Sequence, residues 1–470
     1  MTIIMEMFQK GKELESRIES FFKTNKLGEI LSGAGVYRSK GIPVMQVMMY
    51  LVSLVFTKKS MYMNMQNGTN DPGFHKDVVY RLLNSSNINW AGYLLKLAIS
   101  VIKPIKIATS DDRLCALVVD DSLYARARSK HVELLANVHD HASKSKNKFI
   151  RGFRMLTLGW TDGSSFLPLL YRHMSSQNAK SRYNEINQAV DKRSYGYKAR
   201  LQAISSTTEV MLWMLKEAKK INAPAAHVLF DSWFSFPSTM MEICKIGFHG
   251  VGMLKNTTTI KYIEDGVKKT LKEIYTSHRK RPGRSKYLLS AEVLLYNDKG
   301  ETMPGRIVFV RDRKNSKRWL AIGTTDMTLS EESIIQLYGK RWDIEVFFKM
   351  CKSYLNLAKE FQGISYDSIT AHTAIVMTRY IMLAADKRHN EDPRTFTELF
   401  HSCYDEIADI TFARALSLIL DTLHATLQEC LFLSDAEMNT IISTFIDGIT
   451  ANFRDFLSCP QSLALSTQKC

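Results

Sequence analysis

A carboxylate, a phenol and several cations recur at helical spacing in the stretch 338–352, which reads YGKRWDIEVFFKMCK. Plotted on a helix, four polar side chains fall within about one third of the circumference: Tyr338, Arg341, Glu345 and Lys352. The apolar residues form a separate stripe that one helix could bury. A single acid among cations is also typical of a salt-bridged surface, so a catalytic interpretation requires further acids to join Glu345.

Two apolar segments elsewhere end in aspartates. The segments 114–121 (LCALVVDD) and 225–234 (AAHVLFDSWF) are typical of strands that are buried on both faces. The apolar run of the first segment ends at Asp120 and Asp121, and that of the second ends at Asp231. Functional side chains collect at the carboxyl ends of parallel strands, although aspartates there also serve as caps and turns. Because successive strand residues face opposite ways, only one of Asp120 and Asp121 can point at a shared site.

Three carboxylates from separate elements suit metal-dependent phosphoryl transfer. Two divalent cations about 3.5–4 Å apart would activate the attacking oxygen and stabilise the leaving one, and Mg²⁺ prefers such oxygen ligands. Other chemistries are less well supported. The seven cysteines include no CxxC pair, no GxxxxGK[ST] phosphate loop is present, and neither Ser122 nor Ser232 lies in a glycine-flanked nucleophile turn.

The distribution of charge indicates a polyanionic partner. The 470 residues carry a net charge of +16. Residues 255–318 hold 17 Lys and Arg against 7 Asp and Glu, whereas residues 391–470 hold 4 against 12. This contrast suits a protein that grips nucleic acid with one part only. The longest apolar run, 44–56, is too short to cross a bilayer, and the scattered cysteines favour a reducing compartment, so a cytoplasmic protein is expected.

The pattern of elements predicts an α/β fold with a mixed sheet. Helical spacing dominates the first 105 residues, which would suit either a small DNA-binding module or any other helical bundle. The order that follows is strand, hairpin, helix, strand, helix, strand. The expected organisation is a helical DNA-end-binding domain at 1–110, a catalytic core at 111–254, a basic β-rich insertion at 255–325, the last core helix with Glu345 at 326–365, and a helical acidic region at 366–470.

The spacing Tyr-(2)-Arg-(3)-Glu-(6)-Lys resembles the signature of bacterial DDE transposases in the "insertion sequence four" group. Tyr338, Arg341, Glu345 and Lys352 match it at every position. With VVDDS and VLFDSWF, the resemblance covers about residues 114–355. It implies a ribonuclease-H-like core that is interrupted by a β-rich insertion between the second Asp and the Glu.

The resemblance also implies the catalytic acids. In that family the first catalytic Asp directly precedes a small hydroxyl residue, which selects Asp121 before Ser122 rather than Asp120. Asp121, Asp231 and Glu345 would then be both the catalytic residues and the ligands of Mg²⁺, with Mn²⁺ as the alternative metal.

The same resemblance assigns DNA contacts. Tyr338, Arg341 and Lys352 would contact phosphates near the cut end. Trp319 occupies the place of a tryptophan that stacks on a flipped base in some members, although a strand tryptophan in a small core is an equal interpretation. Trp342 is expected to pack beside the DNA or against the insertion.

The expected function is a transposase that cleaves the ends of an insertion sequence and joins them to target DNA. Its partners would be double-stranded DNA, namely the terminal inverted repeats and the target, and a second copy of the chain on the paired end. The acidic tail is a candidate dimer surface. Two alternatives stay open: a DNA-binding relative that does not cleave, and a ribonuclease-H-like nuclease without strand transfer.

Overall fold

The computed structural model describes residues 17–389, apart from short gaps, and a few single residues beyond 389. The gaps are 38–39, 58–59, 67–71, 111–112, 141–148, 283–284, 313–314 and 316–317. The chain divides into two compact units, Met1–Arg17 with Ser402–Cys470 and Ile18–His401. The second unit holds nearly all described residues, including every described strand. The candidate dimer surface in the acidic tail lies outside the described residues.

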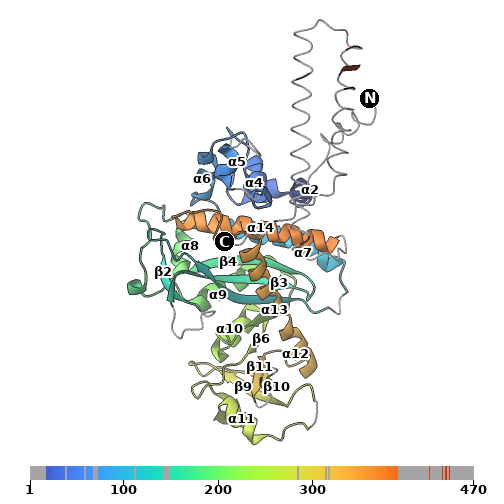
Figure 1. Cartoon of the computed structure of the whole chain (residues 1–470). Coiled ribbons are helices and arrows are strands. Elements are labelled where there is room, and N and C mark those ends of the chain that lie inside the picture. The colour runs from blue at the N-terminus through green and yellow to red at the C-terminus, as the bar shows by residue number, and fades with distance from the viewer. Residues whose placement is uncertain are drawn as a thin grey trace, which may run out of the picture. The chain divides into compact units, whose positions relative to one another are not determined.

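The eleven strands of the described chain form one mixed sheet (Figure 1). Their order is β2-β3-β1-β5-β6-β11-β10-β9-β7-β8, and β4 also pairs with β3. β5 is parallel to both β1 and β6, and all other pairs are antiparallel. The expected α/β class with a mixed sheet is therefore confirmed. The strands are β1 (Ala116–Ala125), β2 (Ala136–His139), β3 (Phe149–Thr161), β4 (Phe166–Met174), β5 (His227–Phe230), β6 (His249–Met253), β7 (Tyr262–Glu264), β8 (Val267–Lys269), β9 (Leu289–Tyr296), β10 (Thr302–Arg311) and β11 (Trp319–Thr324).

The centre of the sheet follows from the apolar runs. Leu117, Val118 and Val119 in β1 are completely buried, as a strand covered on both faces requires. β3 and β4 form the expected hairpin, and Gly163 in its turn has a φ of 88° that favours glycine. The Asp162 carboxylate closes the turn by accepting the backbone N–H groups of Ser164 and Ser165.

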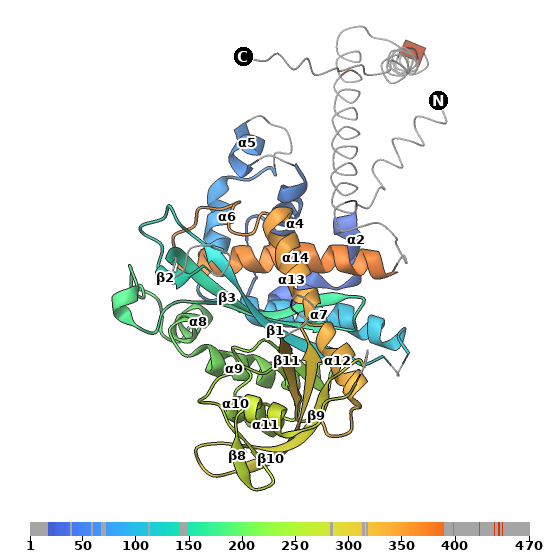
Figure 2. The same ribbon diagram turned by 60° about the horizontal axis from the view of Figure 1, so that its bottom comes forward.

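Helices cover both faces of the sheet (Figures 1 and 2). One face packs against α7 (Trp90–Ile107), α13 (Trp342–Ser353) and α14 (Tyr366–His389), and the Tyr171 hydroxyl on β4 donates to the Thr370 carbonyl of α14. The other face packs against α9 (Thr207–Lys220) and α10 (Pro237–Ile246). We refer to these as the α13 face and the α9 face.

The remaining helices are short. The short helices are α2 (Arg17–Thr24), α3 (Leu27–Gly33), α4 (Val44–Ser53), η1 (Leu54–Thr57), α5 (Met61–Gln66), α6 (Lys76–Leu83), η2 (Ala179–Ser181), α8 (Tyr195–Ala203), α11 (Leu271–Ser277) and α12 (Glu331–Gly339). None of the described helices is both long and apolar enough to span a lipid bilayer.

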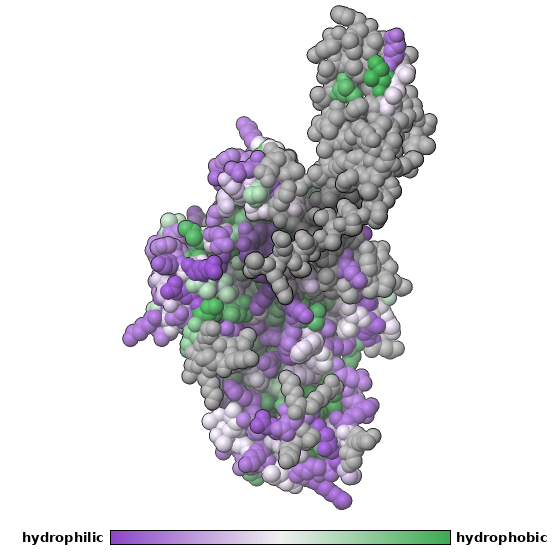
Figure 3. Space-filling view, in the orientation of Figure 1, coloured by the Kyte–Doolittle hydropathy of each residue, from purple (hydrophilic) through white to green (hydrophobic). Residues whose placement is uncertain are grey.

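The β-rich segment 255–325 continues the central sheet. Its last strand, β11, pairs antiparallel with β6, and β10, β9, β7 and β8 extend the sheet outward. The surface of this part of the molecule is largely hydrophilic in the view of Figure 3. A continuous sheet therefore links this basic segment to the strands that carry the aspartates.

Arg379 of α14 ties together three segments that are distant in sequence. Its guanidinium is completely buried and donates to the carbonyls of Leu51 and Val52 in α4 and of Leu355. It also donates to the Glu360 carboxylate at 2.9 and 3.0 Å. Burial alone would raise the pKa of Glu360, but Arg379 holds that pKa below its usual range.

Replacing Arg379 by methionine would leave Glu360 as a buried charge without its main partner. We expect Arg379→Met to lower the free energy of unfolding by about 3–5 kcal/mol, measured by urea denaturation. Arg193→Met, which removes an exposed arginine paired with Asp191, should leave the midpoint unchanged. Equal midpoints for the two variants would contradict the role of Arg379.

Asp326 fastens the loop after β11 to the start of β5. One carboxylate oxygen accepts the Thr328 backbone N–H and hydroxyl at 2.9 and 2.6 Å, and the other lies 2.7 Å from His227 Nε2. Burial alone would raise the pKa of Asp326, but the hydrogen bonds from Thr328 and His227 outweigh it and lower the pKa to about 2.

A lowered carboxyl pKa stabilises the fold at neutral pH. The contribution of Asp326 is complete above its unfolded-state pKa of 3.8 and is lost as pH falls through about 2. Asp326→Asn should therefore cost about 1–2 kcal/mol of unfolding free energy at pH 7, and the difference from wild type should shrink towards pH 2. Urea denaturation at both pH values measures this. A difference that did not change with pH would contradict the assignment.

Candidate active site

The parallel strands β1 and β5 place two aspartates side by side. Their last paired residues are Val119 and Phe230, so Asp120 and Asp231 follow at the next position of the same register. Paired residues of neighbouring strands point to the same face, whereas successive residues point to opposite faces. Asp120 and Asp231 therefore share the α13 face, and Asp121 belongs to the α9 face.

The two aspartates also share a local geometry. The Oδ1 of Asp120 accepts the backbone N–H of Asp121 at 2.8 Å, and the Oδ1 of Asp231 accepts that of Ser232 at 2.6 Å. Each side chain is thus held against the backbone of the next residue. Asp120 lies where β1 stops pairing with β5, and Asp231 lies just after the end of β5.

The stretch 338–352 forms two helices rather than the single helix that its spacing predicts. α12 ends just after Tyr338, and α13 begins at Trp342. Between them, the N–H groups of Lys340 and Arg341 bond to carbonyls three residues back, at 3.1 and 3.0 Å, so the turn is tighter than an α-helix. Arg341 keeps helical dihedrals (φ −55°, ψ −28°). Side-chain periodicity therefore cannot distinguish this turn from a continuous helix.

Arg341, at this turn, connects the strand acids to the helix acid. Its Nη1 donates to Asp120 Oδ2 at 2.9 Å, and its Nη2 donates to Glu345 Oε1 at 2.6 Å. The guanidinium also lies 6.0 Å from the centre of the Tyr338 ring. The structure thus brings Glu345 to the same face of the sheet as Asp120 and Asp231.

The electrostatics of this cluster favour a cation. Burial raises the pKa of Asp120 to about 6; Arg341 opposes this shift, and the charges of Asp121 and Asp231 add to it. Burial also raises the pKa of Tyr338 to about 12. Burial lowers the pKa of Arg341, but Tyr338, Asp120 and Glu345 together raise it above its usual value. Closely spaced carboxylates thus depend on positive charge to stay ionised.

Asp121 has a different partner on the α9 face. Its carboxylate accepts two hydrogen bonds from Arg154 of β3, from Nε at 2.6 Å and from Nη2. The resemblance selected Asp121 as the first catalytic acid, whereas the register places Asp120 beside Asp231. No motif in the sequence indicated Arg154, because its proximity depends on the pairing of β3 with β1.

Lys352, at the other end of α13, donates to the Ser122 hydroxyl at 2.7 Å. Burial lowers the pKa of Lys352, and the neighbouring Arg154 lowers it further. Ser122 lies two residues beyond Asp120 and therefore on the same face. Arg341 and Lys352 thus bind β1 at two points along the α13 face.

A model of the DDE superfamily endonuclease family matches residues 47–291, just over half of the chain. The chain belongs to the DDE superfamily endonucleases. A separate search of curated proteins found no match. The matched residues include Asp120, Asp121 and Asp231 but not Glu345. The DDE class is therefore confirmed, while the "insertion sequence four" group remains a prediction. The observed mixed sheet is consistent with the ribonuclease-H-like fold of DDE enzymes.

The two tryptophans singled out in this DDE endonuclease differ in their surroundings. Trp319 begins β11 and stacks on Tyr275, with ring centres 4.9 Å apart and planes 23° apart. Its ring centre also lies 5.1 Å from that of Phe309 in an edge-to-face arrangement. Trp342 begins α13 and is 61% exposed. Trp319 is thus placed in an aromatic cluster, and Trp342 is free to contact a partner.

A third tryptophan was missed by the sequence reasoning. Trp233 follows Asp231 by two residues and is 59% exposed, with Lys255 Nζ 4.8 Å from its ring centre. Phe236, in the same turn, is 41% exposed. The available signal was the pair of aromatics directly after the acid in FDSWF, which resembled the end of a buried strand.

DDE endonucleases generally use divalent metal ions, and the donors here fit such a metal chemically. Asp120, Asp231 and Glu345 offer only carboxylate oxygens, which Mg²⁺ and Mn²⁺ prefer. In the described part of the chain, however, no three His, Cys, Asp or Glu side chains are close enough together to hold a metal ion as they stand. Arg341 holds oxygens of both Asp120 and Glu345, so a metal would have to draw these carboxylates away from it.

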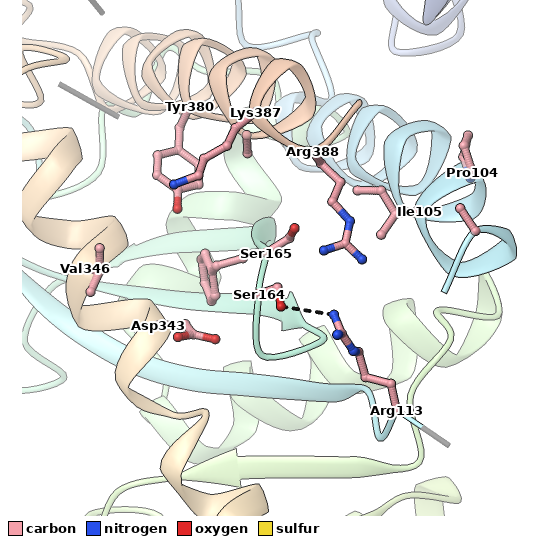
Figure 4. A pocket seen from close by; sticks show the side chains of 13 residues that line it. Pro104, Ile105, Arg113, Ser164, Ser165, Asp343, Val346, Tyr380, Lys387 and Arg388 are labelled. Atoms are coloured by element: carbon pink, nitrogen blue, oxygen red, sulfur yellow. Dashed lines mark hydrogen bonds between the residues drawn. The ribbon is translucent and has the colours of Figure 1, made fainter. Parts of the chain in front are cut away.

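A cavity of about 800 Å³ lies beside the first turns of α13 (Figure 4). Arg113 and Arg388 point towards the hairpin turn at its centre, where Arg113 Nη1 donates to the Ser164 hydroxyl at 3.0 Å. Both arginines also contact the buried Asp162 carboxylate, at 3.5 and 3.1 Å. Neither Asp120 nor the other two clustered acids line this cavity, so it is separate from the carboxylate cluster.

Proposed function

We propose that this DDE endonuclease is a DNA transposase that cleaves the ends of an insertion sequence and joins them to target DNA. The observation that carries the proposal is the shared register of Asp120 and Asp231, with Glu345 linked to Asp120 through Arg341. These acids come from β1, from the residue after β5 and from α13, on one face of a mixed sheet. The matching family supports DNA as the substrate.

In this proposal Asp120, Asp231 and Glu345 are the ligands of Mg²⁺ or Mn²⁺. The bound metal would lower the pKa of the attacking water or 3′-hydroxyl and stabilise the leaving oxygen. Asp120 is preferred to Asp121 because it shares a face with Asp231. Asp121 keeps the Arg154 guanidinium in place, and the resemblance-based choice of Asp121 as a ligand is the alternative that experiment must decide.

The phenol and the two cations around the acids would hold the DNA strand. Tyr338, Arg341 and Lys352 lie on or beside α13, where they could bind phosphates on either side of the cut bond. When a phosphate draws Arg341 away, Asp120 and Glu345 become available as ligands. Trp342 and Trp319 remain candidates for DNA contact.

The remaining parts would position whole DNA ends. We assign residues 1–110 to end recognition, the basic segment 255–325 to phosphate contacts, and the core at 111–254 and 326–365 to cleavage. The acidic region 366–470 would support a homodimer on two paired ends. The substrates are the terminal inverted repeats and the target duplex.

Single substitutions of the four acids distinguish the triad that contains Asp120 from the triad that contains Asp121. Asp120→Asn, Asp231→Asn and Glu345→Gln should each reduce nicking by at least about 1000-fold, whereas Asp121→Asn should stay within about tenfold of wild type. Nicking is measured on supercoiled plasmid that carries the inverted repeats flanking the gene, in Mg²⁺. The exposed Asp298→Asn is the matched control. Loss in Asp121→Asn with retention in Asp120→Asn would establish Asp121 as the ligand instead.

The same plasmid assay distinguishes the alternative functions. A relative that binds without cleaving would shift the DNA in a gel and leave it uncut at every metal concentration. A nuclease without strand transfer would nick the ends, but no element would be recovered in a second, target plasmid. The transposase proposal requires both the nicks and the joined products.

The cavity in Figure 4 is a candidate extension of the DNA path along α13. Removing Arg113 and Arg388 together should weaken binding of end DNA and reduce the slope of log K against log salt by about 0.9 for each phosphate that the variant no longer neutralises. Lys220→Met, at the end of α9 on the opposite face, is the control. An unchanged salt slope in the double variant Arg113→Met/Arg388→Met would exclude this path.

A further inference from the structure

A second, smaller cavity lies beyond β4, between the starts of α7 and α14 and the helices α8 and α9. Its volume is about 230 Å³, several times that of a water molecule, for which about 30 Å³ is typical. None of the proposed catalytic residues lines it. The residues important for its chemistry are Trp90, Arg172, Lys198, Trp213, Glu217 and Asp367.

Arg172 of β4 is a buried cation without an anion. Arg172 is only 5% exposed, and its Nε has no hydrogen-bond partner. Within the described residues its guanidinium makes no hydrogen bond or ion pair. Its neighbour is the Trp213 ring, 5.1 Å away. Since arginine stays charged inside proteins, a guanidinium in this position demands a counter-charge.

Trp90 contributes a second unpaired donor to the same cavity. It is 3% exposed, and its indole Nε1 is buried without an acceptor among the described residues. Buried donors are almost always paired. Both residues line the same cavity, and one of them is cationic, which favours a ligand with several acceptor oxygens and negative charge.

The carboxylates that also line the cavity are already engaged elsewhere. Both oxygens of Asp367 accept from Arg200, at 2.9 and 2.7 Å. Glu217 Oε1 accepts from Lys220 at 2.6 Å. Lys198 is exposed among the lining residues and adds positive charge. Neither carboxylate pairs with Arg172, so an anion from outside the described chain would complete its surroundings.

We propose that Arg172 and Trp90 form a binding site for a phosphate group. The planar guanidinium fork matches two oxygens of an oxyanion, and the indole N–H would donate to a third. The phosphate comes either from free inorganic phosphate or from the terminal phosphate of a nucleic acid. This site is independent of the proposed cleavage site, so either can fail without the other.

The test uses the full-length chain and sodium phosphate, with sodium chloride at matched ionic strength. Titration calorimetry should detect phosphate binding to wild type, and phosphate should raise its melting temperature. In Arg172→Met, affinity for phosphate should fall at least about tenfold and the phosphate-dependent shift should vanish. Without phosphate this variant should melt no lower than wild type, because an unpaired buried charge has been removed.

Trp90→Phe keeps the ring packing and removes only the indole N–H, so it should weaken phosphate binding about threefold or more while the protein stays folded. Arg193→Met, at an exposed arginine outside the cavity, is the matched control and should bind like wild type. An equal phosphate shift in wild type and Arg172→Met, or no phosphate binding by wild type, overturns the proposal. Oligonucleotides with and without a 5′-phosphate identify the source, since preference for the phosphorylated one assigns the site to nucleic-acid ends.

Discussion

The parallel pairing of β1 with β5 is the constraint on which the proposed active site depends. Because Val119 pairs with Phe230, the next residues of both strands are aspartates that point to one face. A shift of one residue would send one of them to the opposite face. Burial of the two apolar strands therefore also fixes the position of Asp120 relative to Asp231.

Grouping half-buried carboxylates where the central strands β1 and β5 stop pairing has an electrostatic cost, and the nearby cations offset it. Arg341 pairs with Asp120 and Glu345, and Arg154 pairs with Asp121 on the other face. This explains why Glu345 lies in a basic stretch that, in isolation, resembles a salt-bridged surface. The tight turn between α12 and α13 matters as well, because it sets Arg341 where one guanidinium reaches both acids.

The two cavities illustrate different uses of arginine. Beside α13, Arg113 and Arg388 share the buried Asp162, so their charge is partly neutralised and they line an accessible cavity. Beyond β4, Arg172 forms no ion pair within the described residues, because Asp367 in the same cavity pairs with Arg200. Removing the acid beside Arg113 and Arg388 would leave charges unpaired, whereas Arg172 is already unpaired and can be paired by the proposed phosphate.

The sequence alone determined the α/β class, the mixed sheet, the three regions that carry acids, and the DDE class, because apolar periodicity and short motifs are local properties. It also placed Glu345 among cations. Only the tertiary structure decided which of Asp120 and Asp121 lies beside Asp231, that 338–352 is two helices, that Arg154 pairs with Asp121, and that Trp233 is exposed next to Asp231. These depend on strand register, on a tight turn that keeps helical dihedrals, and on pairing between distant segments, none of which leaves a periodic signal in the chain.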